Sequence, residues 1–139
     1  MVGPFVLDVS ATLAWCFENE ATAASRSLLG TLAERVVVVP ELWHIELANA
    51  VLQAERRRRL TERESSDFLE MLQDLRIETD QECSGRAFGP LLALSRRHKL
   101  TSYDACYLDV AIRRRLPLAT RDRELRAAAR ATGVPLIDT

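Results

Sequence analysis

Short, mostly apolar segments alternate with longer amphipathic stretches along this chain. Five of these short segments predict β-strands: residues 5–9, 36–39, 76–79, 117–120 and 135–137. The first, second and last are short apolar runs, which are typical of strands in a sheet that is covered on both faces. The pattern therefore predicts a sheet that lies inside the molecule.

The stretches between these strands carry helical patterns. Helices are expected at residues 22–34, 42–59, 61–75, 83–98, 102–115 and 123–132. Thr61 and Glu64 form a capping-box signature, Pro90 predicts a break or kink, Ser102 is expected as a cap, and Gly133 ends the last helix. Strands that alternate with single or paired helices favour a mostly parallel sheet with helices on both faces. We therefore expect a three-layer α/β/α fold with about five strands.

The composition is that of one soluble globular domain spanning residues 1–139. The chain has 47% hydrophobic and 28% charged residues, which argues against disorder. No apolar run approaches the roughly 18 residues of a membrane span, and the N-terminus is interpreted as a strand rather than a signal peptide. The three cysteines, Cys16, Cys83 and Cys106, match neither a zinc-site spacing nor a disulfide framework. Reduced thiols in a cytoplasmic protein are the expectation.

The net charge of -1 does not indicate a polyanionic partner. The arginines, however, are clustered along the sequence. They form runs at residues 56–59 and 113–115 and a pair at 121 and 123. Guanidinium groups bind phosphates well, yet solvated helix ends are also rich in cations. Arg113, Arg114, Arg121 and Arg123 are kept as candidate contacts to substrate phosphates, with the solvated helix end as the alternative.

Four acidic residues far apart in sequence occupy places that one α/β fold would bring together. Asp8 ends the first strand, Glu46 lies just over a turn into a helix, Asp104 lies in a first helical turn, and Asp122 follows the fourth strand. In open parallel sheets, ligands bind outside the carboxyl ends of the strands. Carboxylates gathered at one place disfavour one another's ionised forms, and a bound divalent cation offsets this cost. Oxygen ligands suit Mg²⁺ or Mn²⁺.

Each acid also has an ordinary structural interpretation. Asp8 could cap a helix that begins near Ala11, although Ser10 could do so instead and orient Asp8. Glu46 could face solvent beside Asn49, Asp104 could interact only with the helix dipole, and Asp122 could cap the last helix. Thr120 could hold the loop that carries Asp122. Joint placement at one edge of the sheet favours the metal-site interpretation.

Four segments together resemble the PIN-domain family, in particular the VapC-like ribonuclease toxins of bacterial toxin–antitoxin pairs. They are VLDVSA, PELWHIELANAV, TSYDACYLDVA and LPLATRDREL, and the likeness covers essentially the whole chain. The resemblance implies that the four acids form the active site and that Asp8 and Asp104 are the principal magnesium ligands. It implies that Ser10, Asn49 and Thr120 are supporting positions. It also implies a VapB-like antitoxin and a homodimer.

The clearest departure from the family pattern is Asp109, where a small apolar residue is more usual. The departure leaves the four acids untouched and bears on helix packing and on the substrate groove.

The resulting hypothesis is a metal-dependent endoribonuclease. One or two Mg²⁺ or Mn²⁺ ions would polarise a phosphodiester and lower the pKa of the attacking water. Glu46 and Asp122 are the additional, possible metal ligands. A phospho-aspartate receiver domain is a weaker alternative, because it needs a lysine at a strand end and Lys99 ends a helix. A non-catalytic module whose acidic pocket binds a basic peptide is the other alternative.

Overall fold

The computed structural model describes residues 3–139 and places four parallel strands in one sheet. The strands are β1 (Phe5–Leu7), β2 (Val37–Pro40), β3 (Ile77–Asp80) and β4 (Leu118–Ala119), in the order β3-β2-β1-β4. All neighbouring pairs are parallel, as expected.

The fifth strand, expected at residues 135–137, does not form as predicted. Leu136 forms only an isolated parallel bridge to Leu118. The amide of Leu118 donates to Pro135 and the amide of Ile137 donates to Leu118. The neighbouring strand β4 is two residues long and Pro135 has no N–H, so the ladder cannot extend.

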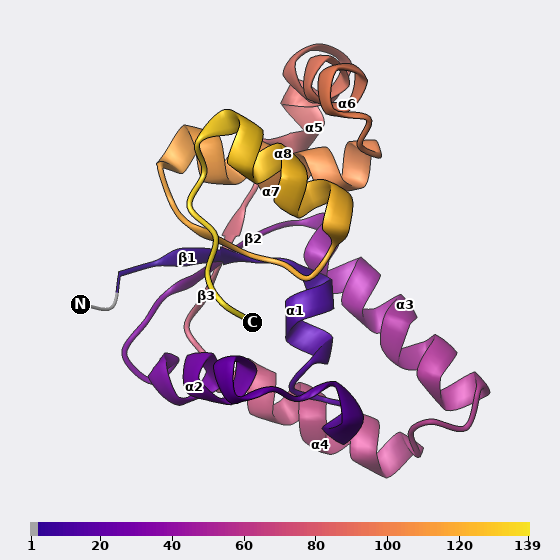
Figure 1. Ribbon diagram of the computed structural model, residues 1–139. Coiled ribbons are helices and arrows are strands. Elements are labelled where there is room, and N and C mark those ends of the chain that lie inside the picture. Colours follow the sequence, from indigo (N-terminus) through magenta and orange to yellow (C-terminus); the bar gives the residue numbers. More distant parts are fainter. Residues whose placement is uncertain (1–2) are drawn as a thin grey trace.

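Helices cover both faces of the sheet (Figure 1). They are α1 (Val9–Leu13), α2 (Ala23–Thr31), α3 (Leu42–Arg56), α4 (Glu62–Gln73), α5 (Cys83–Arg86), α6 (Leu92–His98), α7 (Ser102–Arg114) and α8 (Arg123–Thr132), with a 3₁₀ turn, η1 (Glu18–Glu20). The break expected at Pro90 takes the form of a π-helical turn, η2 (Ala87–Leu91), between α5 and α6. Among residues 3–139, no helix is long and apolar enough to cross a bilayer.

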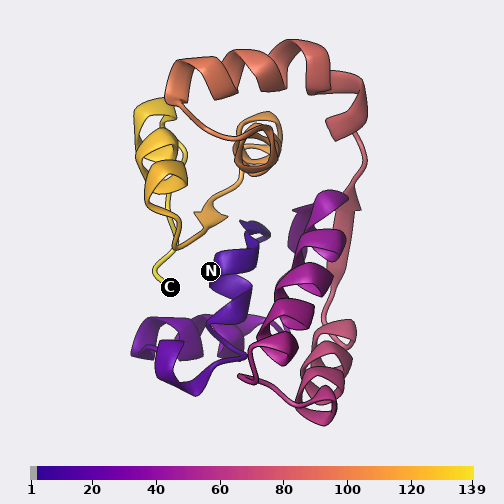
Figure 2. The ribbon, with the colours of Figure 1, turned by 90° about the vertical axis from the view of Figure 1, so that its right-hand side faces the viewer.

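The layers follow the three-layer expectation. Helices α2 and α4 lie on one side of the sheet, and α7 and α8 lie on the other (Figure 1). Helix α7 packs against β1, β2 and β4. Helices α1 and α3 lie on the side of the molecule that Figure 2 turns toward the viewer, where α7 is seen end-on.

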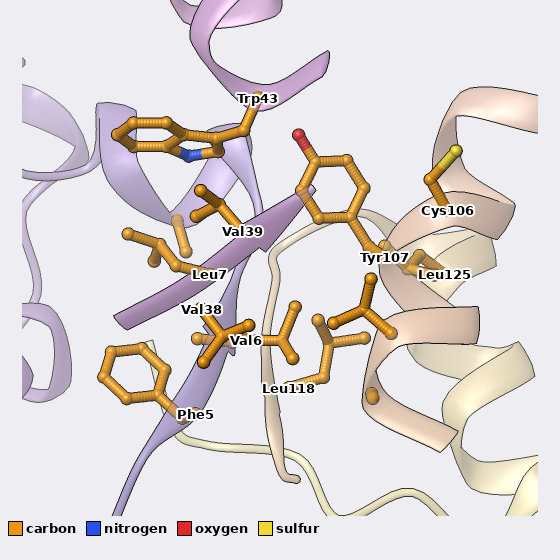
Figure 3. Packing of buried hydrophobic residues seen from close by; sticks show 14 of the residues in the cluster. Phe5, Val6, Leu7, Val38, Val39, Trp43, Cys106, Tyr107, Leu118 and Leu125 are labelled. Atoms are coloured by element: carbon orange, nitrogen blue, oxygen red, sulfur yellow. The ribbon is translucent and has the colours of Figure 1, made fainter. Parts of the chain in front are cut away.

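Helix α7 is held in place by the hydrophobic core. Residues 105–111 of this helix are all buried, and β1 is completely buried. Figure 3 shows Tyr107 of α7 packed among β-strand side chains such as Val6 and Val39. Because α7 is held along most of its length, its first and last turns are rigid positions for polar side chains.

Candidate active site

Asp8 is held where β1 turns into α1. Its side chain is only 6% exposed. Oδ1 accepts the Val9 amide at 2.7 Å, so Asp8 caps α1, which begins at Val9 rather than near Ala11. Oδ2 accepts the hydroxyls of Ser10 at 2.8 Å and Thr120 at 2.6 Å. The carboxylate is thus fixed in one orientation at the end of the strand.

The loop after β4 is tied to the same point. Ser10 Oγ accepts the amide of Arg121 at 2.8 Å, and Thr120 Oγ1 accepts the amide of Asp122 at 3.1 Å. Asp122 in turn caps α8 by accepting the amide of Leu125 at 2.8 Å. Because β1 and β4 are neighbours, these bonds bring the Asp122 loop to the end of β1.

Glu46 enters the site from α3. The side chain is partly buried, and Oε1 accepts the hydroxyl of Tyr107 at 2.6 Å. The sequence offered no signal for this bond, since the two residues are 61 positions apart. Asn49, the expected supporting residue one turn further along α3, is exposed.

Asp104 lies in the first turn of α7, as expected, and is partly buried. The predicted cap of this helix, Ser102, is wrong. Thr101, rather than Ser102, is the N-cap, and its hydroxyl accepts the Asp104 amide at 3.1 Å. The Asp104 carboxylate therefore need not cap its own helix.

The four acids, called here the acidic quartet (Asp8, Glu46, Asp104 and Asp122), lie near enough to influence one another's ionisation. The pKa of Asp104 is raised to about 6, first by burial and then by the charges of the other three acids, while the Thr101 hydrogen bond opposes this shift. Burial also raises the pKa of Asp8, against hydrogen bonds to its charged form that lower it, and Asp122 adds a further upward shift.

The pKa of Glu46 is raised by the same effects. Burial is the largest, the Tyr107 hydrogen bond opposes it, and the charge of Asp8 adds to it. Across residues 3–139, no ion pair includes a member of the quartet. The quartet is therefore a region of negative charge without an internal counter-ion.

The structure does not supply a ready-made metal cage. Among the described residues, no three His, Cys, Asp or Glu side chains are grouped so that they could together hold one ion. The quartet consists of carboxylate oxygens that repel one another when ionised. A bound cation, or protonation of one carboxyl, would reduce this repulsion.

Two of the arginines predicted to contact substrate phosphates, Arg113 and Arg114, make ion pairs within the protein. Arg113 donates through Nε to Asp109, through Nη2 to Asp80 and through Nη1 to Asp80 and Glu82. Arg114 pairs with Asp80 and with Glu78. These guanidinium groups neutralise acids of the protein itself and lie at the opposite end of α7 from Asp104.

The other two candidate arginines differ from each other. The Arg121 side chain donates to the backbone carbonyl of Glu20 at 2.6 Å. Arg123 is exposed in the first turn of α8, next to Asp122. Of the four candidate arginines, Arg123 is the one that is exposed next to an acid of the quartet, as a contact to a substrate phosphate requires.

Sequence reasoning missed several polar residues that hold this structure together. Asp80 ends β3 and is buried, but no pattern distinguished it from other strand-end acids. Asp109 departs from the family pattern, and its i,i+4 spacing to Arg113 is the sequence signal for the ion pair that the structure contains. Tyr107 lies within the TSYDACYLDVA segment, and no local pattern predicts its bond to Glu46.

Comparisons with known proteins agree with the geometry. Residues 5–131 match the family model described as PIN domain. A search of curated proteins finds no match. PAE2754 from Pyrobaculum aerophilum has a similar structure, with 26% identity, a TM-score of 0.68, and coverage of 92% of this chain and 87% of that chain.

Two further solved structures share the fold at lower identity. VapBC2 from Rickettsia felis, bound to a DNA fragment from its promoter, is 14% identical with a TM-score of 0.64, and 96% of each chain is covered. FitAcB from Neisseria gonorrhoeae is 16% identical with a TM-score of 0.65, again with 96% of each chain covered. Because the family model spans nearly the whole sequence, the chain belongs to the PIN domain family.

Proposed function

We propose that this protein is a divalent-cation-dependent endoribonuclease and that the acidic quartet is its catalytic site. One observation carries the proposal: four carboxylates from separate elements repel one another without a basic partner among residues 3–139. Such an arrangement costs stability, and a functional site is the usual reason for the cost. PIN domains are generally nucleases, which supports the same reaction class.

The quartet suits Mg²⁺ or Mn²⁺ by the chemistry of its donors. All four side chains offer only oxygen, the ligand type that these ions prefer. Mg²⁺ keeps several waters and commonly binds through one or two carboxylates, so a cage of three preformed ligands is not required. Asp8 and Asp104 are the principal ligands in this proposal, and Glu46 and Asp122 complete the pocket.

The bound cation would supply charge stabilisation at the phosphate and a more acidic attacking water. Within the protein, Ser10 and Thr120 hold Asp8 in one orientation. Glu46, whose Oε1 is already bonded to Tyr107, has Oε2 left to orient water. Arg123, exposed beside Asp122, can contact a flanking phosphate.

The biological setting that we propose is a toxin–antitoxin pair. The structural neighbours include VapBC2 from Rickettsia felis and a toxin–antitoxin complex from Klebsiella pneumoniae. The latter is 18% identical with a TM-score of 0.55, and 85% of this chain and 86% of that chain are covered. By analogy, a small VapB-like antitoxin would bind and silence this chain, which would itself form a homodimer. The substrate is RNA.

Asp8→Asn tests the proposal with little change in structure. Asparagine keeps an oxygen for the Val9 amide, and the hydroxyls of Ser10 and Thr120 can rotate to accept from its amide group. We expect RNA cleavage with Mg²⁺ or Mn²⁺ by the natural protein, no cleavage with EDTA, and at least a thousandfold loss in the variant, which is about 4 kcal/mol of barrier.

The matched control is Asp67→Asn, at an exposed position on α4. It should cleave RNA like the natural protein. Undiminished metal-dependent cleavage by pure Asp8→Asn protein would rule out this mechanism. Binding of a basic peptide without any RNA turnover would instead indicate a non-catalytic module.

A further inference from the structure

Tyr107 is a buried phenol whose polar atom reaches the acidic quartet. The residue is fully buried in α7, and its hydroxyl donates to Glu46 Oε1 at 2.6 Å. In Figure 3 the ring lies among core side chains, and the hydroxyl oxygen points toward the helix that carries Trp43. That helix, α3, also carries Glu46.

Core packing explains the ring of Tyr107 but not its hydroxyl. A phenylalanine would fill the same space without a buried polar atom that needs a partner. The hydroxyl has a carboxylate partner, Glu46 Oε1, on a different helix. A hydrogen bond from a buried donor to a carboxylate is short and strong, so it holds the Glu46 side chain in one orientation.

The position of Tyr107 along α7 is also informative. It lies three residues after Asp104, and residues at this spacing share one face of a helix. Helix α7 thus presents an acid of the quartet and the hydrogen-bond donor to a second acid from the same side. One rigid element sets the relative placement of two carboxylates that belong to different helices.

The backbone of α3 is anchored independently of Tyr107. Trp43 Nε1 donates to Thr12 Oγ1 at 3.3 Å, and the Thr12 hydroxyl donates to the backbone carbonyl of Asp8 at 2.9 Å. The rotamer of the Glu46 side chain is not set by these bonds. An immobilised glutamate loses rotamer entropy, so a strong hydrogen bond is needed to hold it.

We propose that Tyr107 is a positioning residue for the active site: it fixes Glu46 through Oε1, so that Oε2 would be the oxygen available to a bound cation or its water. The inference rests on the proposed function of the quartet and assigns a role to a residue outside it. Tyr107 does not touch the substrate and acts only through Glu46.

Tyr107→Phe is the direct test, because it removes the hydroxyl and keeps the ring. We expect kcat for RNA cleavage to fall about 10- to 100-fold, as for other residues that orient metal-site ligands, with KM for RNA unchanged. Mn²⁺ affinity, measured by calorimetry without RNA, should weaken by at least about tenfold. Tyr103→Phe is the matched control: Tyr103 is on the same helix and 64% exposed, so neither quantity should change.

A double-mutant cycle separates positioning from general packing. In the Glu46→Gln background, Tyr107→Phe should cause no further loss of kcat or of Mn²⁺ affinity, because the residue through which it acts is already altered. Equal losses in both backgrounds would overturn the inference. So would a Tyr107→Phe protein that matches the natural one in kcat and Mn²⁺ affinity.

The Mn²⁺ measurement also distinguishes the two proposals. If the natural protein cleaves no RNA yet binds Mn²⁺, and Tyr107→Phe weakens that binding while Tyr103→Phe does not, positioning by Tyr107 stands and the nuclease proposal falls. If the natural protein neither binds Mn²⁺ nor cleaves RNA, both proposals fall.

Discussion

The two ends of helix α7 lie beside acids in opposite circumstances. At the N-terminal end, Asp104 faces three other carboxylates, and burial together with their charges raises its pKa to about 6. At the C-terminal end, Arg113 and Arg114 lie in the last turn and bind Asp80. Burial opposes ionisation of Asp80 as well, but hydrogen bonds led by that from Arg113 outweigh it and lower its pKa to about 2.

This second group, the Asp80–Asp109 cluster, consists of two buried acids and three arginines: Asp80, Asp109, Arg86, Arg113 and Arg114. Every carboxylate oxygen of Asp109 and Asp80 accepts from a guanidinium group. Arginines at a helix C-terminus also complement its dipole. The comparison teaches that the acids at one end are neutralised by arginines and hold the fold together, whereas those at the other end accept hydrogen bonds from neutral groups and, among residues 3–139, have no arginine partner.

The largest expected effect is on catalysis at the N-terminal end. Asp104→Asn should reduce kcat for RNA cleavage at least a thousandfold, or about 4 kcal/mol of barrier, because the amide cannot supply the missing charge. Initial rates at saturating Mg²⁺ measure this. Full activity would show that the quartet does not need Asp104.

The corresponding change at the C-terminal end should affect stability instead. Asp80→Asn leaves two arginines without their buried partner and should cost about 3 kcal/mol of unfolding free energy in urea. Cleavage per folded molecule should stay within about twofold of the natural protein. The control is Glu78→Gln: this acid pairs with Arg114 at the surface and should cost less than about 1 kcal/mol.

Acid should weaken the C-terminal cluster over a defined range of pH. The pKa of Asp80 is about 2 in the folded protein and about 3.9 in an unfolded chain, so its stabilisation is complete above about pH 4. This stabilisation is lost as the pH falls toward 2. The unfolding free energy of Asp80→Asn should therefore fall less steeply between these values. Parallel curves for the two proteins would contradict the role of Asp80.

The smallest effect has the opposite sign and concerns the N-terminal end. The pKa of Asp104 is higher when folded than unfolded, so its charge destabilises the fold near neutral pH. In buffer with EDTA, Asp104→Asn should raise the unfolding free energy by about 1 kcal/mol at about pH 7. The gain should shrink as the pH falls from about 6 toward 4, where the natural side chain becomes protonated. A loss of stability would mean that Asp104 is structural.

Much of the fold follows from local patterns. The apolar runs at β1 and β2 and the amphipathic spacing of α3 and α4 predicted elements close to those found. The exception at residues 135–137 depends on the length of the partner strand β4, which no local pattern specifies.

The amino-acid sequence by itself determined where the quartet acids stand, because a strand end or a first helical turn is a local feature. It did not determine which acids would stay unpaired. Asp8 and Asp80 both end strands, but only Asp80 meets arginines, and these lie 33 and 34 positions later in the chain. Packing of α7 along the sheet brings those arginines to Asp80 and brings Tyr107 to Glu46. The charge state of an acid depends on such distant neighbours, so tertiary structure alone decided which carboxylates within residues 3–139 are paired with arginine.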